Sequence, residues 1–591
     1  MLSYRKLAMR VLGRPLHTGG GIDSPRPASQ RAAALILTAA LLTGAAFPAF
    51  AGTYYIEEGD ITISAGTEAG TNKVEQTGKG TVYNDKDTVI TNQNQDKASS
   101  NTVTIDAGKD KVEVTLKDVN IKADSGSALT SNGDVTLTLK GDNHLTGGSG
   151  DTYGGDGITS SGSLTISGGT VTATGGDSTS SVGSGGSGIY SVSGDVTISG
   201  GTVNANGGDG KNGSGGGSGI DSSGGVTVSG GTVTANGGDS KDGDGGDGGS
   251  GSGSHGGNGI YSSSGVAISG GAVTANGGDS KDGSGGNGIY SSGGVTISSG
   301  STVTANGGDG EDGSGGRGIT SNGGVTVSGG TVNAKGGSGK NGNGGDGIRS
   351  FNPVAISGGT VNANGGNSDY SNGGDGIRSL DHVAISGGTV KSNGGSGNLS
   401  GGNGIISYDI DLSGSLELTA KAGSPNGKAL SRVGSELDLN TIKDKLDPGA
   451  KVTATDADGK VIQQVSIPRP VEPEEPSSSS DSGSATPSAP ASFLPGLTVT
   501  DKDGQRISYT STQSGNTLTV CVGRFTASLR ISLAALRQLR AEGIETITFQ
   551  TILCSTTLSV DELLAMGGED AEVVLTHHIR SSTLTVGGKA V

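Results

Sequence analysis

Between residues 157 and 404 the chain alternates apolar and polar residues in short segments, and the pattern repeats every 28 to 40 residues. Each unit begins with Gly-Ile, at positions 157, 188, 219, 259, 288, 318, 347, 376 and 404. The unit GIYSSSGVAISGGAVTANGGDSKDGSGGN (259–287) contains the segments GIYS, GVAIS and AVTAN. Their apolar residues fall at every second position, the period of a strand with one buried face. Each unit therefore predicts three short strands.

One unit is too small to bury its own apolar side chains, which here are Ile260, Val266, Ile268, Val273 and Ala275. Stacking solves this problem, because each strand then pairs with its copy in the next turn. The result is a parallel β-helix with like residues aligned and turns about 4.8 Å apart. The fold class predicted is all-β, with a right-handed hand favoured by the rules for parallel connections.

Two further features of the repeat carry predictions. Asparagines fall at one register and indicate a ladder of side-chain amides bonded along the axis: Asn206, Asn236, Asn276 and Asn306. SGG separates the second and third strands and predicts a turn, since glycine tolerates a positive φ. The glycine-rich end of each unit is expected to be a flexible loop.

The regular units occupy the middle of a longer chain. Alternation before and after them extends the predicted β-helix to residues 52–440, with a cap at 441–466. Residues 467–493 are rich in Pro, Ser and acidic residues and indicate a linker. Residues 494–591 predict a small α+β domain, with strands in NTLTVCVG, ETITFQTIL and AEVVLTHHI and helices in SLAALRQLRAEG and VDELLAMGG. Ser532 is the expected cap of the first helix and Gly543 its end.

Composition limits the kind of core that the chain can have. Of 591 residues 118 are glycine, none is tryptophan, and aromatics make up 3%. Stability therefore has to come from stacking rather than from a core of large side chains. The two cysteines, Cys521 and Cys554, leave two alternatives open, a disulfide or two buried thiols.

The first 51 residues have the features of an export signal. Basic residues precede the apolar run AAALILTAALLTGAAF, and Ala49-Phe50-Ala51 is a small-x-small cleavage site. An uncleaved membrane anchor is the alternative. Removal of residues 1–51 takes away six positive charges and one negative charge, which changes the net charge from −17 to −22. We therefore expect a secreted or cell-surface protein that does not bind nucleic acid or anionic lipid.

The stretch VEVTLKDVNIKADSGSALTSNGDVTLTLKGDNHLTGG (112–148), followed by Gly-Ile and VTISGGTV units, resembles the carbohydrate-binding β-helix family of clostridial surface proteins. The resemblance covers about residues 52–440. It implies a pectate-lyase-like right-handed β-helix and an association with cellulose, acidic-sugar polymers and calcium. It supplies no binding motif for particular positions.

The outward position after Gly-Ile forms the first candidate site, for carbohydrate. Tyrosine rings there offer a flat surface for sugars, and arginines pair with uronate carboxylates in a bidentate manner. The candidates are Tyr190, Tyr261, Tyr290, Arg349 and Arg378. Tyr and Arg are also ordinary outward residues of a sheet, which leaves a structural role open.

The second candidate site is acidic. Aspartates follow Gly-Gly in five consecutive units: Asp177, Asp209, Asp239, Asp279 and Asp309. Stacked carboxylates repel one another unless a cation lies between them, and calcium takes oxygen ligands flexibly. Later units carry Ser338, Asn367 and Ser396 instead. A solvated acidic loop without metal therefore stays open as the alternative.

Three function classes fit these observations. We expect an exported, non-catalytic polysaccharide-binding protein whose partner is cellulose or an acidic plant or wall glycan, with calcium as its only expected cofactor. A structural adhesin or stalk without sugar affinity is the alternative, and its C-terminal domain would attach to a cell-wall component. A polysaccharide lyase fits less well, because no catalytic residue stands out from the repeat as a local exception.

Overall fold

The computed structural model describes residues 52–468 and 497–590, with gaps at 181–182, 212–213, 242–254, 433, 502–504, 508, 515, 523–525, 552–554, 567–570, 578–581 and 588. The predicted export signal (1–51), nearly all of the predicted linker and Cys554 lie outside the described residues. The chain divides into two compact units at Glu472 and Pro473. Among the described residues, none of the helices is long and apolar enough to cross a membrane.

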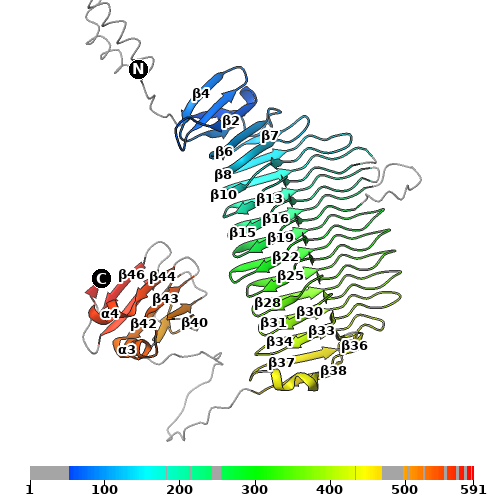
Figure 1. Cartoon of the computed structure of the whole chain (residues 1–591), viewed down its shortest axis with the longest axis vertical. Helices are drawn as coiled ribbons and strands as arrows, with labels where there is room; N and C mark the ends of the chain where they lie inside the picture. The colour runs from blue at the N-terminus through cyan, green and yellow to red at the C-terminus, as the bar shows by residue number, and fades with distance from the viewer. Residues whose placement is uncertain are drawn as a thin grey trace, which may run out of the picture. The chain divides into compact units, whose positions relative to one another are not determined.

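The first unit is a right-handed parallel β-helix of about 14 turns, which confirms the predicted fold class (Figure 1). Its strands form three columns, each strand pairing in parallel with its copy one turn on. The first column follows Gly-Ile: β9 (Ile158–Ser160), β11 (Ile189–Ser191), β14 (Ile220–Ser222), β17 (Ile260–Ser262), β20 (Ile289–Ser291), β23 (Ile319–Ser321), β26 (Ile348–Ser350), β29 (Ile377–Ser379), β32 (Ile405–Ser407) and β35 (Leu430–Arg432).

The second and third columns come from the other two segments of each unit. The second contains β12 (Val196–Ile198), β15 (Val226–Val228), β18 (Val266–Ile268), β21 (Val295–Ile297), β24 (Val325–Val327), β27 (Val354–Ile356), β30 (His382–Ile385) and β33 (Asp409–Leu412). The third contains β13 (Thr202–Asn206), β16 (Thr232–Asn236), β19 (Gly271–Asn276), β22 (Ser301–Asn306), β25 (Thr331–Lys335), β28 (Thr360–Asn364), β31 (Thr389–Asn393), β34 (Glu417–Lys421) and β37 (Lys451–Thr455).

Both ends of the stack are closed by less regular elements (Figure 1). The N-terminal end contains β1 (Thr53–Tyr55), η1 (Ile56–Glu58), β2 (Ile61–Ala65), β3 (Asn72–Gln76), β4 (Gly80–Asp85), β5 (Val89–Thr91), β6 (Val103–Lys117), β7 (Asn120–Lys122), β8 (Leu129–Thr146) and β10 (Leu164–Thr174). There β2, β3 and β4 pair antiparallel. The C-terminal end has β36 (Ser435–Glu436), η2 (Leu439–Lys445) and β38 (Val461–Ser466), which pairs antiparallel with β37.

The interior of the β-helix is filled by the apolar side chains that alternate along each strand. The five apolar residues of the quoted unit are at most 2% exposed. Ile260 pairs in register with Ile289, and Val273 pairs with Val303. Aligned β-branched side chains suit this narrow interior, because they pack well on a pleated surface.

Where the structure describes them, the glycine-rich ends of the units are ordered and hydrogen-bonded, so the prediction of flexible loops was wrong there. Backbone hydrogen bonds run as a zigzag from turn to turn: Gly278 N–H donates to Gly257 O, Gly286 N–H to Gly278 O and Gly308 N–H to Gly286 O, at 2.8, 2.8 and 2.9 Å. These glycines are buried. At each of these glycines two backbone segments approach so closely that a side chain would not fit between them. The glycines therefore form a packed layer beside the strands.

The predicted amide ladder is confirmed. Nδ2 of Asn236, Asn276 and Asn306 each donates to Oδ1 of the asparagine one turn earlier, at 2.8 Å in every case. The SGG turns have the expected backbone too, with φ of +76° at Gly271.

The second unit is a small α+β fold. One sheet has the order β39 (Leu497–Thr500), β42 (Ala527–Ser532), β45 (Glu572–His577), β46 (Ser582–Val586), β47 (Lys589–Ala590). The other has the order β40 (Thr510–Ser514), β41 (Thr517–Cys521), β43 (Thr546–Gln550), β44 (Ser555–Ser559). The predicted helices are present as α3 (Leu533–Ala541) and α4 (Val560–Met566).

Details at three residues bear on the predictions for this unit. Ser532 caps α3 by accepting the N–H of Ala535 at 3.1 Å, and Gly543 follows with φ of +92°. Cys521 is partly buried and has no disulfide partner among the described residues, and its Sγ lies 3.5 Å from Oε1 of Gln550.

Candidate functional site

The first strand column places the predicted carbohydrate-binding residues in one row on a lateral face. Adjacent turns pair these outward residues in order: Thr159, Tyr190, Asp221, Tyr261, Tyr290, Thr320, Arg349, Arg378 and Ile406. We call this set the Tyr–Arg row. All five predicted residues lie in it and are partly exposed. Asp221 interrupts the tyrosines, and Thr320 separates Tyr290 from Arg349.

Two of the tyrosines stack on each other. The rings of Tyr261 and Tyr290 lie 5.3 Å apart between centroids, at an interplanar angle of 6°. Nδ2 of Asn322 donates to the Tyr290 hydroxyl at 3.3 Å. A sugar ring therefore has no room between this pair and would contact the ring edges, the hydroxyls or the outer faces.

The row is hollowed beside Arg349. A shallow cavity of about 400 Å³ is lined by Tyr290, Arg317, Thr320, Asn322, Arg349 and Phe351. Phe351 is 45% exposed, and the Arg349 guanidinium lies 5.4 Å from its ring centroid. A cation on an aromatic face leaves the planar edge of the guanidinium available for hydrogen bonds.

A second hollow follows along the same face. It has a volume of about 260 Å³ and is lined by Arg378, Ser379, Leu380, Ile406, Ser407, Tyr408 and Gly434. Tyr408 is 65% exposed. An arginine beside an exposed aromatic residue thus occurs in both hollows.

Phe351, Leu380 and Tyr408, the residues two positions after the row, were not among the predicted site residues. Most earlier units have small polar residues there, such as Ser263 and Ser292, and Val192 is an exception. Three large apolar residues in consecutive units at that position were a usable signal. They were overlooked because the position lies just past the end of each strand.

Two buried aspartates lie behind the arginines. Asp346 and Asp375 are 6% and 5% exposed. Asp346 Oδ2 lies 3.6 Å from Arg317 Nε and 3.7 Å from Arg349 Nη1. Asp375 Oδ2 lies 3.3 Å from Arg378 Nη1. The carboxylates hold the arginines in place from the protein side, as bidentate recognition on the outer side requires.

The arginines keep unused hydrogen-bond donors. Nε of both Arg349 and Arg378 is buried and has no hydrogen-bond partner among the described residues. A buried donor without a partner is costly, and charged donors cost most. A small turn of either side chain would let this N–H donate to a ligand oxygen.

Burial and charge shift the titration of this cluster. Burial, followed by the charge of Asp346, raises the pKa of Asp375 to about 6. Burial, followed by repulsion from Arg317, lowers the pKa of Arg349, which still stays protonated at neutral pH. The cluster therefore combines three guanidinium groups with two carboxyl groups, a local excess of basic groups on a strongly acidic protein.

The predicted metal ligands form a column on the glycine-rich side of the turns. Each carboxylate accepts the backbone N–H of the next turn, at 3.0 Å for Asp177, Asp209 and Asp239, 2.7 Å for Asp279 and 2.6 Å for Asp309. Lysines of the following turn pair with the same column: Lys211 Nζ lies 3.1 Å from Asp177, and Lys241 contacts Asp209. Within the described ranges, no group of three or more His, Cys, Asp or Glu could hold a metal ion.

Replacement of Lys241 by methionine tests the role of these lysines. We expect Lys241→Met to lower the free energy of unfolding by less than about 1 kcal/mol, because the pair is exposed. Half a molar NaCl should shrink the difference, since salt screens exposed charges. Urea melts at low and high salt give the measurement, and a salt-independent loss would contradict an electrostatic role.

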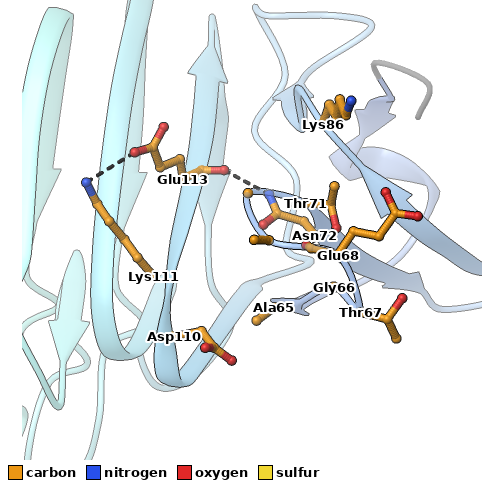
Figure 2. A pocket seen from close by; sticks show the side chains of 12 residues that line it. Ala65, Gly66, Thr67, Glu68, Thr71, Asn72, Lys86, Asp110, Lys111 and Glu113 are labelled. Carbon is orange, nitrogen blue, oxygen red and sulfur yellow. Dashed lines mark hydrogen bonds and ion pairs between the residues drawn. The ribbon is translucent and has the colours of Figure 1, made fainter. Parts of the chain in front are cut away.

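Another hollow lies at the N-terminal end of the stack. This cavity has a volume of about 490 Å³ and is lined by the loop at 66–71 and by residues of β6. Figure 2 shows the side chains that line it. Its polar groups bind one another: Lys111 Nζ lies 3.1 Å from Glu113, and Asn72 Nδ2 donates to Glu113 O at 2.8 Å. No aromatic residue lines it. It is therefore a weaker candidate than the Tyr–Arg row.

Comparison with known proteins bears on the fold. The Beta helix repeat family model matches residues 164–188, 196–218 and 354–377. No curated protein and no solved structure gives a significant match. The repeat matches and the stacked strands together support a parallel β-helix fold for the first unit.

Proposed function

We propose that this chain is an exported, non-catalytic surface protein that binds a polysaccharide along the Tyr–Arg row. One observation carries the proposal: two hollows on the same face each combine an exposed aromatic residue with an arginine whose buried Nε has no partner among the described residues. Aromatic surface suits the apolar face of a sugar ring, and guanidinium suits a carboxylate. The preferred ligand is an acidic plant or wall glycan, with cellulose as the neutral alternative.

The spacing of the row supports a polymer rather than a single sugar. Successive row residues are about 4.8 Å apart along the axis. Arg349 and Arg378 are direct neighbours in register, and Tyr290 lies two turns before Arg349. A chain lying along the axis would contact several turns together, and each added contact raises its affinity.

Export, surface location and attachment through the second unit are parts of the same proposal. They rest on the features of residues 1–51 and on the division of the chain into two units. The aspartate column is not part of the proposal as a calcium site, because its carboxylates already accept backbone N–H groups and pair with lysines.

Binding to defined polymers tests the proposal. Residues 52–466 should be retained on calcium-pectate gel. The double variant Arg349→Gln with Arg378→Gln should weaken binding to polygalacturonate at least tenfold, because it removes both guanidinium groups that pair with the carboxylates of the polymer. Lys391→Gln, which removes a cation from the third column, is the matched control. EDTA added to soluble polygalacturonate separates the calcium contribution. Retention on neither pectate nor cellulose would contradict the proposal.

A structural stalk without sugar affinity is the second candidate. It is favoured by the ladders of Asn and Asp, which are satisfied within the stack and leave little for a ligand to complete. The same pull-down decides between the two functions.

A further inference from the structure

The Tyr–Arg row changes sign along its length. Its earlier turns carry Asp221, with Asp156 nearby in the preceding part of the first column. Its later turns carry Arg349 and Arg378, with Arg317 in the hollow beside them. Aromatic residues accompany both halves. One face therefore presents an acidic aromatic section followed by a basic aromatic section.

Asp221 is the distinctive group of the acidic section. It is paired in register with Tyr190 on one side and Tyr261 on the other. It is partly buried, and in the described part of the chain no hydrogen bond or ion pair involves its carboxylate. A carboxylate between two tyrosines without a cation of its own is an incomplete charge pair.

The chemistry that completes this arrangement is an ammonium group. An ammonium ion interacts favourably with aromatic rings and pairs with a carboxylate, and partial desolvation strengthens both effects. A neutral hydroxyl would not satisfy the charge of Asp221. A carboxylate ligand would be repelled by it.

The two sections lie at a defined separation. Asp221 and Arg349 are four turns apart, since Tyr261, Tyr290 and Thr320 lie between them in the row. At about 4.8 Å per turn they are about 19 Å apart. One oligosaccharide of moderate length can contact both.

We propose that the ligand of this face is a zwitterionic glycan, which places an amino sugar at Asp221 between Tyr190 and Tyr261 and a carboxylate at Arg349 and Arg378. The inference rests on the proposed polysaccharide binding and deepens it. It assigns Asp221 the role of selecting for a free amine, and it assigns a direction to the bound chain relative to the axis of the β-helix.

Paired oligosaccharides test this inference. One probe alternates glucuronic acid and glucosamine with free amines, and the other is the same chain with every amine acetylated. The first should bind residues 52–466 at least fivefold more tightly by calorimetry near neutral pH. Asp221→Asn should abolish that preference without weakening the acetylated probe. Arg349→Gln with Arg378→Gln should weaken both probes.

The outcomes separate the two proposals. Equal affinity for the two probes would overturn the zwitterion inference and leave acidic-glycan binding intact. Failure of both probes, together with no retention on pectate or cellulose, would overturn the proposed function itself. Asp134→Asn, at an exposed carboxylate on β8, is the matched control and should leave the preference unchanged.

Discussion

Gly286→Ala should lower the free energy of unfolding by at least about 3 kcal/mol, the upper range for overpacking a closely packed interior. A Cβ at this position would lie 1.9 Å from the carbonyl oxygen of Gly257, one turn earlier. The obstacle is backbone and cannot rotate away. The two turns would have to separate, which would break the hydrogen bond from Gly278 N to Gly257 O. Urea or thermal melts of residues 52–466 give the measurement.

Gly294→Ala is the matched control. Its Cβ would meet nothing closer than 3.6 Å, and its φ is not in the positive range. Removal of glycine from the unfolded chain favours the folded state by about 0.4–1 kcal/mol, so this variant should be neutral or slightly more stable. Similar small effects at both positions would show that the glycine layer is loose, as its composition alone suggested.

The contrast between these glycines shows which parts of the fold the sequence could predict. The alternation in GIYS, GVAIS and AVTAN sets strand faces directly, because the side-chain period of a strand is two. The amide ladder follows from equal spacing. The glycine layer did not follow, because a Gly-rich segment has high conformational entropy when considered alone. Its order comes from bonds to other turns, such as Gly278 N to Gly257 O, which only the stacked structure supplies.

The candidate site, too, has parts that the sequence predicts and parts that it does not. Gly-Ile sets the register, so the order of the Tyr–Arg row could be predicted residue by residue. Phe351 and Tyr408 were not predicted as part of the site, because they lie past the strand ends, where alternation no longer indicates which way a side chain points. That Nε of Arg349 and of Arg378 has no hydrogen-bond partner among the described residues depends on side-chain geometry, which a sequence pattern cannot predict.

Asp221→Asn should stabilise the protein at neutral pH. Burial, followed by the charge of Asp156, raises the pKa of Asp221 from its usual 3.8 to about 6. A carboxyl group with a raised pKa binds its proton more tightly when folded, so stability falls as the pH rises from about 4 to 6. Above pH 6 the charged carboxylate costs about 3 kcal/mol, since each tenfold change in proton affinity corresponds to about 1.4 kcal/mol. Asparagine cannot ionise, so the variant avoids this cost.

The gain should therefore depend on pH in a way that identifies its cause. At pH 7.5 Asp221→Asn should have the higher melting temperature, and at pH 4 the two proteins should melt together. Asp134→Asn should show no such divergence. Loss of stability at pH 7.5 would mean that Asp221 has a favourable partner in the folded protein, which would also remove the basis for an ammonium ligand. Asp221→Asn could both raise the melting temperature at pH 7.5 and lose the preference for free amines. That result would mean that the natural sequence keeps a destabilising carboxylate between Tyr190 and Tyr261 because binding requires it.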